Sequence, residues 1–160
     1  MLKLGGRHVV AALLVASCFC ASPLRASDAL VVETRKGVLL AEIAFDEGQE
    51  LCLSWSHSVT GGAVADCFEN RRGKMILTRS YLHDFAAGLG EVAGRGALRS
   101  AQGGGYWIHG IDEQIHGNAL RLQVGAPHVD HKLRGQNRTL HLSAMAAGSR
   151  LTLRLKTGTP

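Results

Sequence analysis

Aromatic side chains are scarce in this sequence and make up 5% of its 160 residues. Surfaces that bind single-stranded nucleic acid combine aromatic rings with clustered basic side chains. Here the basic residues stand singly or in pairs, and only Trp55, Trp107 and a few other rings accompany them. The formal charge of +5 overstates the basic character, because Lys3, Arg7 and Arg25 all precede the first acidic residue. We therefore expect no nucleic-acid partner, and solvated strand faces account better for the basic residues.

The chain also lacks internal repeats and, beyond its N-terminal segment, any long amphipathic helix. Apolar and polar residues instead alternate with a period of two, which is typical of β-strands with one buried face. This pattern predicts strands at residues 29–35, 37–45, 51–57, 63–69, 74–82, 120–124, 139–143 and 150–156. Short strands separated by frequent turn signals favour a mainly β fold, a small antiparallel β-sandwich or a partly open barrel.

Regularity is weakest in the middle of the chain. Residues 86–105 are rich in glycine and alanine, which predicts a long glycine-rich central loop. The short segment 111–115 is compatible with one helical turn.

Only one apolar run approaches the length of a signal sequence. It covers residues 9–21, follows Lys3 and Arg7, and ends before Pro23. Such a segment is typical of a bacterial secretory signal and is too short to be a membrane-spanning helix. We predict a signal peptide at residues 1–26 and a single β domain at 27–160, exported to the periplasm.

A lipoprotein signal is the alternative. The small residues before Cys18 resemble a lipobox, in which case the signal ends before Cys18 and this cysteine carries lipid. Since no second apolar run of spanning length follows, we expect membrane contact only through such an N-terminal lipid.

Beyond the signal the sequence has no Cys-x-x-Cys motif, and Cys52 and Cys67 are the only cysteines. Two cysteines supply half of a tetrahedral metal shell, whereas in an oxidising compartment they typically form a disulfide. A hairpin that turns between Val59 and Thr60 places Cys52 opposite Cys67, Leu53 opposite Asp66 and Trp55 opposite Val64. By strand parity, Leu51, Leu53, Trp55 and His57 then face the core, and the disulfide lies on the less buried face.

The same hairpin offers side chains for chemistry. His57 stands between Ser56 and Ser58, and Asp66 follows on the returning strand. A Ser-His-Asp hydrolase uses these residue types, but it also needs an exposed nucleophile and an oxyanion hole, and the sequence shows no nucleophile elbow. We favour the interpretation that His57 and Ser58 hydrogen-bond to the backbone of their own turn, with a binding role as second choice and catalysis as third.

Metal-ligand spacing occurs once, at His128, Asp130 and His131. Imidazoles and a carboxylate suit zinc or copper. The segment follows Pro127 and precedes a polar stretch, so we interpret it as a solvated, exposed loop and keep the metal site as the weaker alternative. No cofactor is expected.

An ordered set of motifs resembles the domain of unknown function 1850 family. It comprises Leu53-Ser54-Trp55-Ser56-His57-Ser58-Val59, then Asp66 and Phe68, residues 77–79, Phe85-Ala86-Ala87-Gly88-Leu89, and Gly105-Tyr106-Trp107. The sequence departs from the family pattern at Ala87 and Gly88, where a Gly-Ala-Gly run is usual, and in carrying Asp66 where glutamate is usual. The resemblance implies a small exported or membrane-tethered protein without assigned enzymatic activity. It also implies an association with tripartite ATP-independent periplasmic (TRAP) transporters of the TAXI subgroup.

These observations predict a non-enzymatic exported accessory or binding protein. Its partner is expected to be a TRAP transporter component or a small solute. The expected contact surface is the turn at residues 57–62 together with the loop at residues 85–90, because packing explains family-like residues on turns and loops least. Its candidate residues are His57, Ser58, Phe85 and Gly88, with Asp66 and Asp84 as supporting polar groups. The alternative is a metal- or small-ligand-dependent periplasmic enzyme that uses His57 and Asp66, or His128 and His131.

Overall fold

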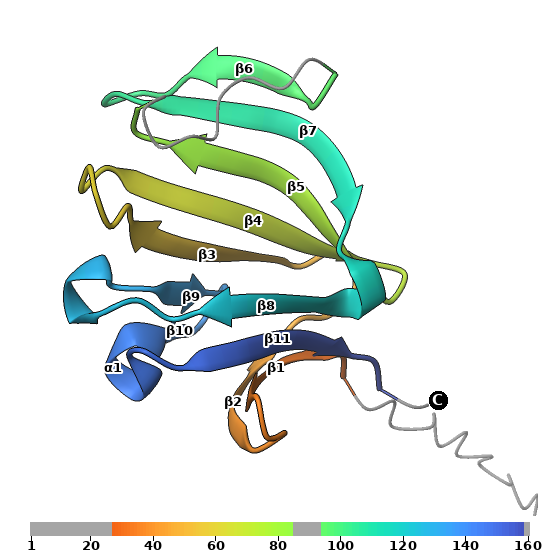
Figure 1. Cartoon of the computed structure of the whole chain (residues 1–160). Helices are drawn as coiled ribbons and strands as arrows, with labels where there is room; N and C mark the ends of the chain where they lie inside the picture. Colours follow the sequence, from red (N-terminus) through yellow and green to blue (C-terminus); the bar gives the residue numbers. More distant parts are fainter. Residues whose placement is uncertain (1–26, 85–93, 159–160) are drawn as a thin grey trace, which may run out of the picture.

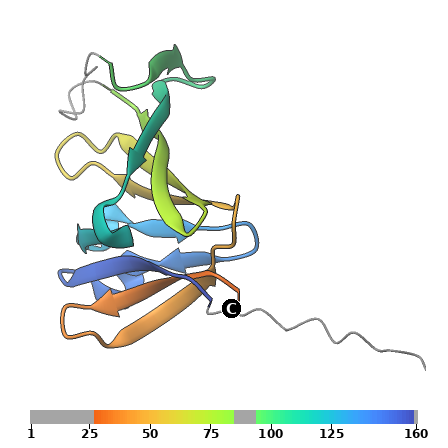
Figure 2. The same ribbon diagram turned by 90° about the vertical axis from the view of Figure 1, so that its right-hand side faces the viewer.

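Two antiparallel β-sheets stack face to face in the computed structural model, which describes residues 27–84 and 94–158 (Figure 1). The view in Figure 2 shows the two layers from the side. The sheets do not close into a barrel, so the fold is the predicted mainly β sandwich. The segment predicted as a signal, including Cys18, lies outside the described residues.

The smaller sheet has four strands in the order β2-β1-β11-β8. In chain order they are β1 (Ala29–Thr34), β2 (Leu39–Ala44), β8 (Ala119–Gln123) and β11 (Arg150–Lys156). β11 alternates between a buried and an exposed face: Leu151, Leu153 and Leu155 are buried, whereas Thr152 and Arg154 between them are not. β1 and β11 form the centre of this sheet, and β2 is one of its edges.

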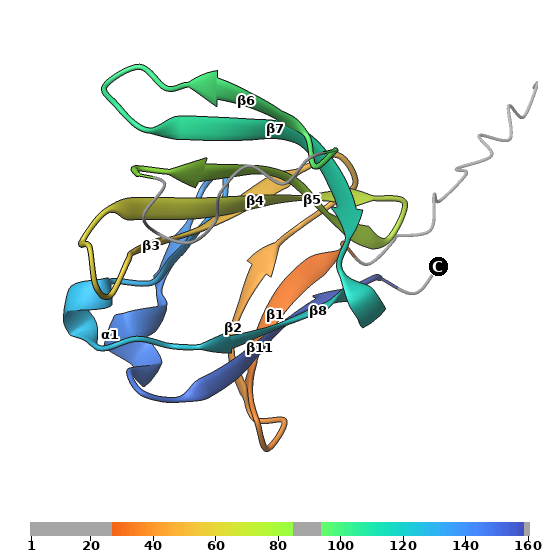
Figure 3. The ribbon, with the colours of Figure 1, turned by 45° about the horizontal axis from the view of Figure 1, so that its top comes forward.

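The larger sheet has seven strands in the order β10-β9-β3-β4-β5-β7-β6 (Figure 3). They are β3 (Glu50–Ser56), β4 (Ala63–Arg71), β5 (Lys74–Leu82), β6 (Ala97–Ser100), β7 (Tyr106–Gln114), β9 (Lys132–Arg134) and β10 (Thr139–His141). Consecutive strands β3, β4 and β5 are joined by tight turns and are neighbours in the sheet. Chain segments far apart in sequence extend it on both sides.

The hydrophobic core lies between the sheets. Its largest fully buried side chains include Phe45, Leu30, Leu51, Met75, Leu133 and Leu153, drawn from both layers. Burial of such side chains is the main favourable term in folding. One end of the core is closed by Asn70, which is fully buried and donates from Nδ2 to the carbonyl oxygen of Phe45 (2.6 Å) and to Asp28 Oδ2 (2.9 Å).

Helical structure is limited to short turns in the described part of the chain. These are α1 (Leu142–Ala146) and the 3₁₀ turns η2 (His116–Asn118) and η3 (Pro127–Val129). None of the described helices is long and apolar enough to cross a membrane.

Most of the predicted strands are present, and two, at 74–82 and 150–156, have the predicted bounds. The helical turn predicted at 111–115 is wrong, because β7 continues through Gln114 and pairs there with β5. The strand predicted at 139–143 ends at His141, where α1 begins. Within the predicted central loop, residues 97–100 form β6 against β7, and residues 85–93 lie outside the described part.

Candidate functional site

The β3–β4 hairpin has the predicted register. Cys52 pairs with Cys67, Leu53 with Asp66 and Trp55 with Val64. A disulfide joins Cys52 and Cys67 across the two strands. Since disulfides persist in oxidising compartments, this bond is compatible with an exported protein.

The two faces of the hairpin are also as predicted, with one difference. Leu51 and Leu53 are buried in the core, and Cys52 on the opposite face is half-buried, but Cys67 is fully buried. Arg79 on β5 stands opposite Cys67 and forms an ion pair with Glu50 on the same face (2.6 Å). This ion pair covers the disulfide from outside.

The tip of the hairpin, residues 57–62, is organised by His57. Its Nδ1 accepts a hydrogen bond from the backbone N–H of Thr60 (3.3 Å) and lies 3.3 Å from the Thr60 hydroxyl. Its backbone N–H donates to the carbonyl of Gly62, and its carbonyl accepts from Gly61 N, both at 2.8 Å. His57 therefore hydrogen-bonds to its own turn, as expected, whereas the Ser58 side chain makes no such bond within the described part of the chain.

This organised tip presents Val59 to solvent, with 86% of its surface exposed. Ser58 is also exposed beside it. Asp84 stands next to the base of the tip, since a Cβ placed on Gly62 would lie 3.0 Å from its Oδ2. Asp84 Oδ1 is buried and has no hydrogen-bond partner among the described residues. The other two predicted contact residues, Phe85 and Gly88, lie outside the described residues.

Asp66 does not join His57 at the tip. It lies on β4 directly opposite Leu53 of β3. Its Oδ1 accepts a hydrogen bond from Ser80 Oγ (2.6 Å). Burial raises the pKa of the Asp66 carboxyl above its ordinary value, although the hydrogen bond from Ser80 opposes the shift. Within the described chain no hydrogen bond links His57 with Asp66, so these residues do not form the Ser-His-Asp relay that a hydrolase requires.

The segment with metal-ligand spacing differs from the exposed loop that we predicted. His131 is buried and stacks on Trp55, with ring centroids 5.7 Å apart. The ring Nδ1 of His131 accepts a hydrogen bond from the backbone N–H of Gly125 (3.2 Å), and the backbone N–H of His131 donates to Ser143 Oγ (2.9 Å). Burial lowers the pKa of His131, because the charged imidazolium is poorly solvated there. The polar neighbours of His131 in the sequence predicted exposure, but the ring is covered by Trp55, which lies far away in sequence.

Asp130 and His128, the other two candidate ligands of this segment, do not join His131. Asp130 forms an ion pair with Lys132, and His128 is exposed. In the described part of the chain the one group of potential ligands within metal-binding distance is Glu50, Cys52 and Cys67, and both of its sulfurs are in the disulfide. These residues therefore offer no thiolate to a metal ion.

Sequence reasoning missed a groove on the outer face of the seven-stranded sheet. This disulfide groove has a volume of about 720 Å³ and is lined by Cys52, Cys67, Arg79, Tyr81, Trp107 and Arg134, among others. The Arg79 guanidinium lies 4.7 Å from the centre of the Trp107 ring, and Tyr81 contacts the same ring at 5.3 Å between centroids. The residues that line the groove come from strands far apart in sequence, so no local motif predicts it.

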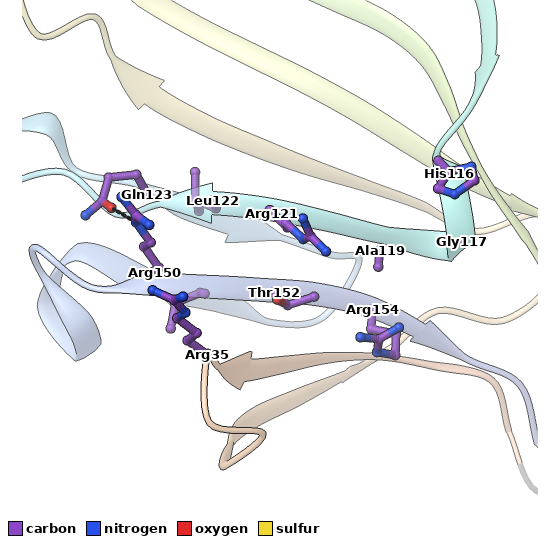
Figure 4. Close-up of a pocket in the computed structure, with 11 residues that line it drawn as sticks. Arg35, His116, Gly117, Ala119, Arg121, Leu122, Gln123, Arg150, Thr152 and Arg154 are labelled. Atoms are coloured by element: carbon purple, nitrogen blue, oxygen red, sulfur yellow. Dashed lines mark hydrogen bonds between the residues drawn. The ribbon is translucent and has the colours of Figure 1, made fainter.

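A second hollow lies on the outer face of the four-stranded sheet and has a volume of about 1000 Å³. Four arginines, Arg35, Arg121, Arg150 and Arg154, line it and gather over β8, β11 and the end of β1 (Figure 4). We call this surface the basic face. The alternation of β8 and β11 was visible in the sequence, but the pairing that brings their arginines together was not.

Comparison with known families gives one match. Residues 51–142 match the model of the family described as Domain of unknown function (DUF1850). This range covers more than half of the chain and includes the β3–β4 hairpin, the disulfide and the disulfide groove. Neither the curated proteins nor the solved structures include a match.

Proposed function

We propose that this chain, which belongs to the DUF1850 family, is an exported, non-enzymatic accessory protein of the periplasm. Its partner in this proposal is a component of a TRAP-type solute importer, and its contact surface is the hairpin tip at residues 57–62 with Asp84 beside it. The disulfide supports the choice of an oxidising compartment.

The observation that carries the proposal is the exposure of Val59. Scattered apolar residues are normal on protein surfaces, but Val59 lies in the turn of this hairpin with 86% of its surface in solvent. A partner with an apolar pocket would bury this side chain, and its removal from water would favour association.

The rigidity of the tip supports the same function. The side chains of His57 and Thr60 fix the turn before any partner arrives. His57 Nδ1 accepts from Thr60 N at 3.3 Å, and Thr60 Oγ1 accepts from Gly62 N at 3.2 Å. The disulfide restrains the two strands behind it. Preorganisation of this kind reduces the entropy that is lost on binding.

Asp84 adds a polar contact at the base of the tip. A buried carboxylate oxygen without a hydrogen-bond donor is costly, and a donor supplied by a partner would remove that cost. The catalytic alternative has less support, because His57 Nδ1 is occupied by its own turn and Asp66 is bonded to Ser80.

Site-specific photocross-linking tests the proposal. p-Benzoylphenylalanine is placed at position 59, and the matched control carries it at position 99, where Arg99 is exposed on β6, the edge strand of the same seven-stranded sheet, separated from β4 by β5 and β7. In membranes of the native host, we expect position 59 to cross-link to a TRAP transporter subunit and position 99 not to. Equal yields at both positions, or no transporter subunit at position 59, would reject this function.

The disulfide groove favours a second candidate, the binding of a small solute. Arg79 is neutralised by Glu50, but Arg134 has no ion-pair partner among the described residues and stands across the groove from Trp107. A solute with a carboxylate and a flat apolar part would suit this arrangement. Titration with benzoate, followed by tryptophan fluorescence, should show saturable quenching that Arg134→Gln abolishes and that Lys74→Gln, at an exposed position outside the groove lining, preserves. Unsaturable quenching in the wild-type protein would exclude the candidate for this probe.

A further inference from the structure

The β1–β2 hairpin belongs to the four-stranded sheet and exposes a second apolar cluster, separate from Val59 (Figure 1). Val38, Leu39 and Leu40 are consecutive, and 57%, 53% and 37% of their surfaces are exposed. They follow the exposed cations Arg35 and Lys36 in the turn. Three adjacent apolar side chains beside two cations form a different surface from a single exposed valine.

Strand register joins this cluster to the basic face. Leu39 pairs with Glu33, Glu33 with Thr152, and Thr152 with Arg121, so these four residues form one row across the outer side of the sheet. The next row towards the turn pairs Arg150 with Gln123. Arg35 lines the same hollow as Arg121 and Arg150, which places the turn and the arginines on one surface (Figure 4).

Cations on this surface are incompletely neutralised. Arg154 and Lys156 share a single acid, Glu33, at 3.5 and 3.0 Å. Arg150 donates to the neutral amide oxygen of Gln123 at 3.1 Å. Within the described part of the chain, Arg35 and Arg121 have no ion pair, and the remaining acid on the face is the exposed Glu42. The surface therefore has an excess of positive charge beside its apolar cluster.

The backbone edge of β2 is partly blocked. β2 is an edge strand, and such strands offer unpaired backbone groups to other chains. Here Arg138 Nη1 donates to the carbonyl oxygen of Glu42 at 3.0 Å. This bond occupies the edge and argues against the addition of a strand from another copy or partner.

We propose that the basic face and the residues Val38, Leu39 and Leu40 dock this domain onto an anionic phospholipid bilayer. Exposed apolar side chains enter the headgroup boundary, and the surrounding arginines attract anionic lipids. Nucleic acid would fit the arginines but leave the apolar cluster in water, and a soluble anion would do the same. This contact is independent of an N-terminal lipid and of the proposed tip interface, and both hairpins are free to act together.

Vesicle flotation tests the docking. The full chain is expressed with its own N-terminal segment, and the exported product is mixed with phosphatidylcholine vesicles with or without phosphatidylglycerol. We expect binding to vesicles that contain phosphatidylglycerol, and we expect added NaCl to weaken it. Every variant shares the same N-terminus, so its contribution cancels in the comparison.

Four double variants separate charge from apolar contact. Arg121→Ser/Arg150→Ser should lower the partition coefficient about thirtyfold, since each basic residue near an anionic surface contributes about 1 kcal/mol. The control Arg99→Ser/Lys74→Ser removes the same charge from exposed positions of the other sheet and should leave binding unchanged. Val38→Thr/Leu39→Thr, which places residues of high β-propensity at both positions, should lower the partition about tenfold. Arg121→Lys/Arg150→Lys retains the charge and should retain binding.

Several results would overturn the proposal. Equal binding with and without phosphatidylglycerol, or equal losses in the arginine variant and its control, would show that the basic face does not bind anionic lipid. Displacement by inorganic phosphate at constant ionic strength, with no effect of Val38→Thr/Leu39→Thr, would assign the site to a soluble anion. A dimer that this apolar variant dissociates would assign the hairpin to a second copy. Thermal unfolding of each variant shows whether it is folded. If the serine variant is unfolded, the wild-type protein on vesicles with and without phosphatidylglycerol and the Val38→Thr/Leu39→Thr variant still decide the question.

Discussion

Two hairpins of this protein expose apolar side chains, and their surroundings differ. The β3–β4 hairpin is clamped by the disulfide, its turn is held by His57, and its exposed Val59 has no cation among its immediate neighbours in the turn. The β1–β2 hairpin lies at a sheet edge, and Thr34 holds its turn by accepting from Val38 N at 3.1 Å. Its apolar residues adjoin Arg35 and Lys36.

The contrast shows how surroundings indicate a partner. A rigid, uncharged tip suits a shaped pocket in another protein, where preorganisation favours affinity. A cation-rich apolar edge suits a fluid anionic surface, where net charge and buried apolar area matter more than shape. The following predictions test whether the two hairpins differ in this way.

Removal of the disulfide should have the largest effect. Cys52→Ala/Cys67→Ala opens a loop with a sequence separation of 15, which in the chain-entropy model costs about 3 kcal/mol of unfolding free energy. Denaturant unfolding of the double variant, compared with the oxidised wild type, measures this loss. The reduced wild type should behave as the variant does. Unchanged stability in both would show that the clamp does not restrain the fold.

His57→Ala should have a smaller effect, about 1 kcal/mol, because the turn loses the acceptor for Thr60 N. Thr34→Val is the matched change in the other hairpin, where Val38 N loses its acceptor. Hydrogen exchange of the Thr60 and Val38 amides should accelerate only in the variant of the same hairpin. If His57→Ala left the exchange of Thr60 unchanged, His57 would not be the residue that organises the tip.

Acid should lower the free energy of unfolding through His131. This is the smallest of the expected effects, and it is absent well above neutral pH. Burial lowers the pKa of His131 in the folded protein, so its stabilising contribution is complete above the unfolded pKa of about 6.5 and is lost as pH falls through that value towards the folded pKa. Unfolding free energy measured from pH 8 to pH 5 should therefore fall less steeply in His131→Gln than in the wild type. Because His131 stacks on Trp55 of β3, tryptophan fluorescence reports the loss. Parallel curves for the two proteins would contradict this account.

Much of the β3–β4 hairpin could be predicted from the sequence, because the residues that determine its register are close together in the chain. Two cysteines, a glycine-containing turn and strict alternation fix one register, and the structure has that register. The alternation of β5 and β11 likewise gave their bounds.

The failures occurred where distant pairing overrides a local pattern. Ile111 and Ile115 have the spacing of a helical face, but β5 extends beside them and β7 continues as a strand. Leu142 continues the alternation of β10, yet Ala144, Met145 and Ala146 favour a helix and the chain turns there. The basic face was missed for the same reason, since its arginines meet only when β1, β8 and β11 pair.

The central claim is that the two hairpins bind different kinds of partner, and one flotation experiment tests it most directly. Val59→Thr and Val38→Thr/Leu39→Thr are compared on vesicles that contain phosphatidylglycerol, at equal protein concentration and low ionic strength. The account predicts that Val59→Thr binds as the wild-type protein does and that Val38→Thr/Leu39→Thr loses about tenfold. Equal losses in both variants, or a loss confined to Val59→Thr, would contradict it.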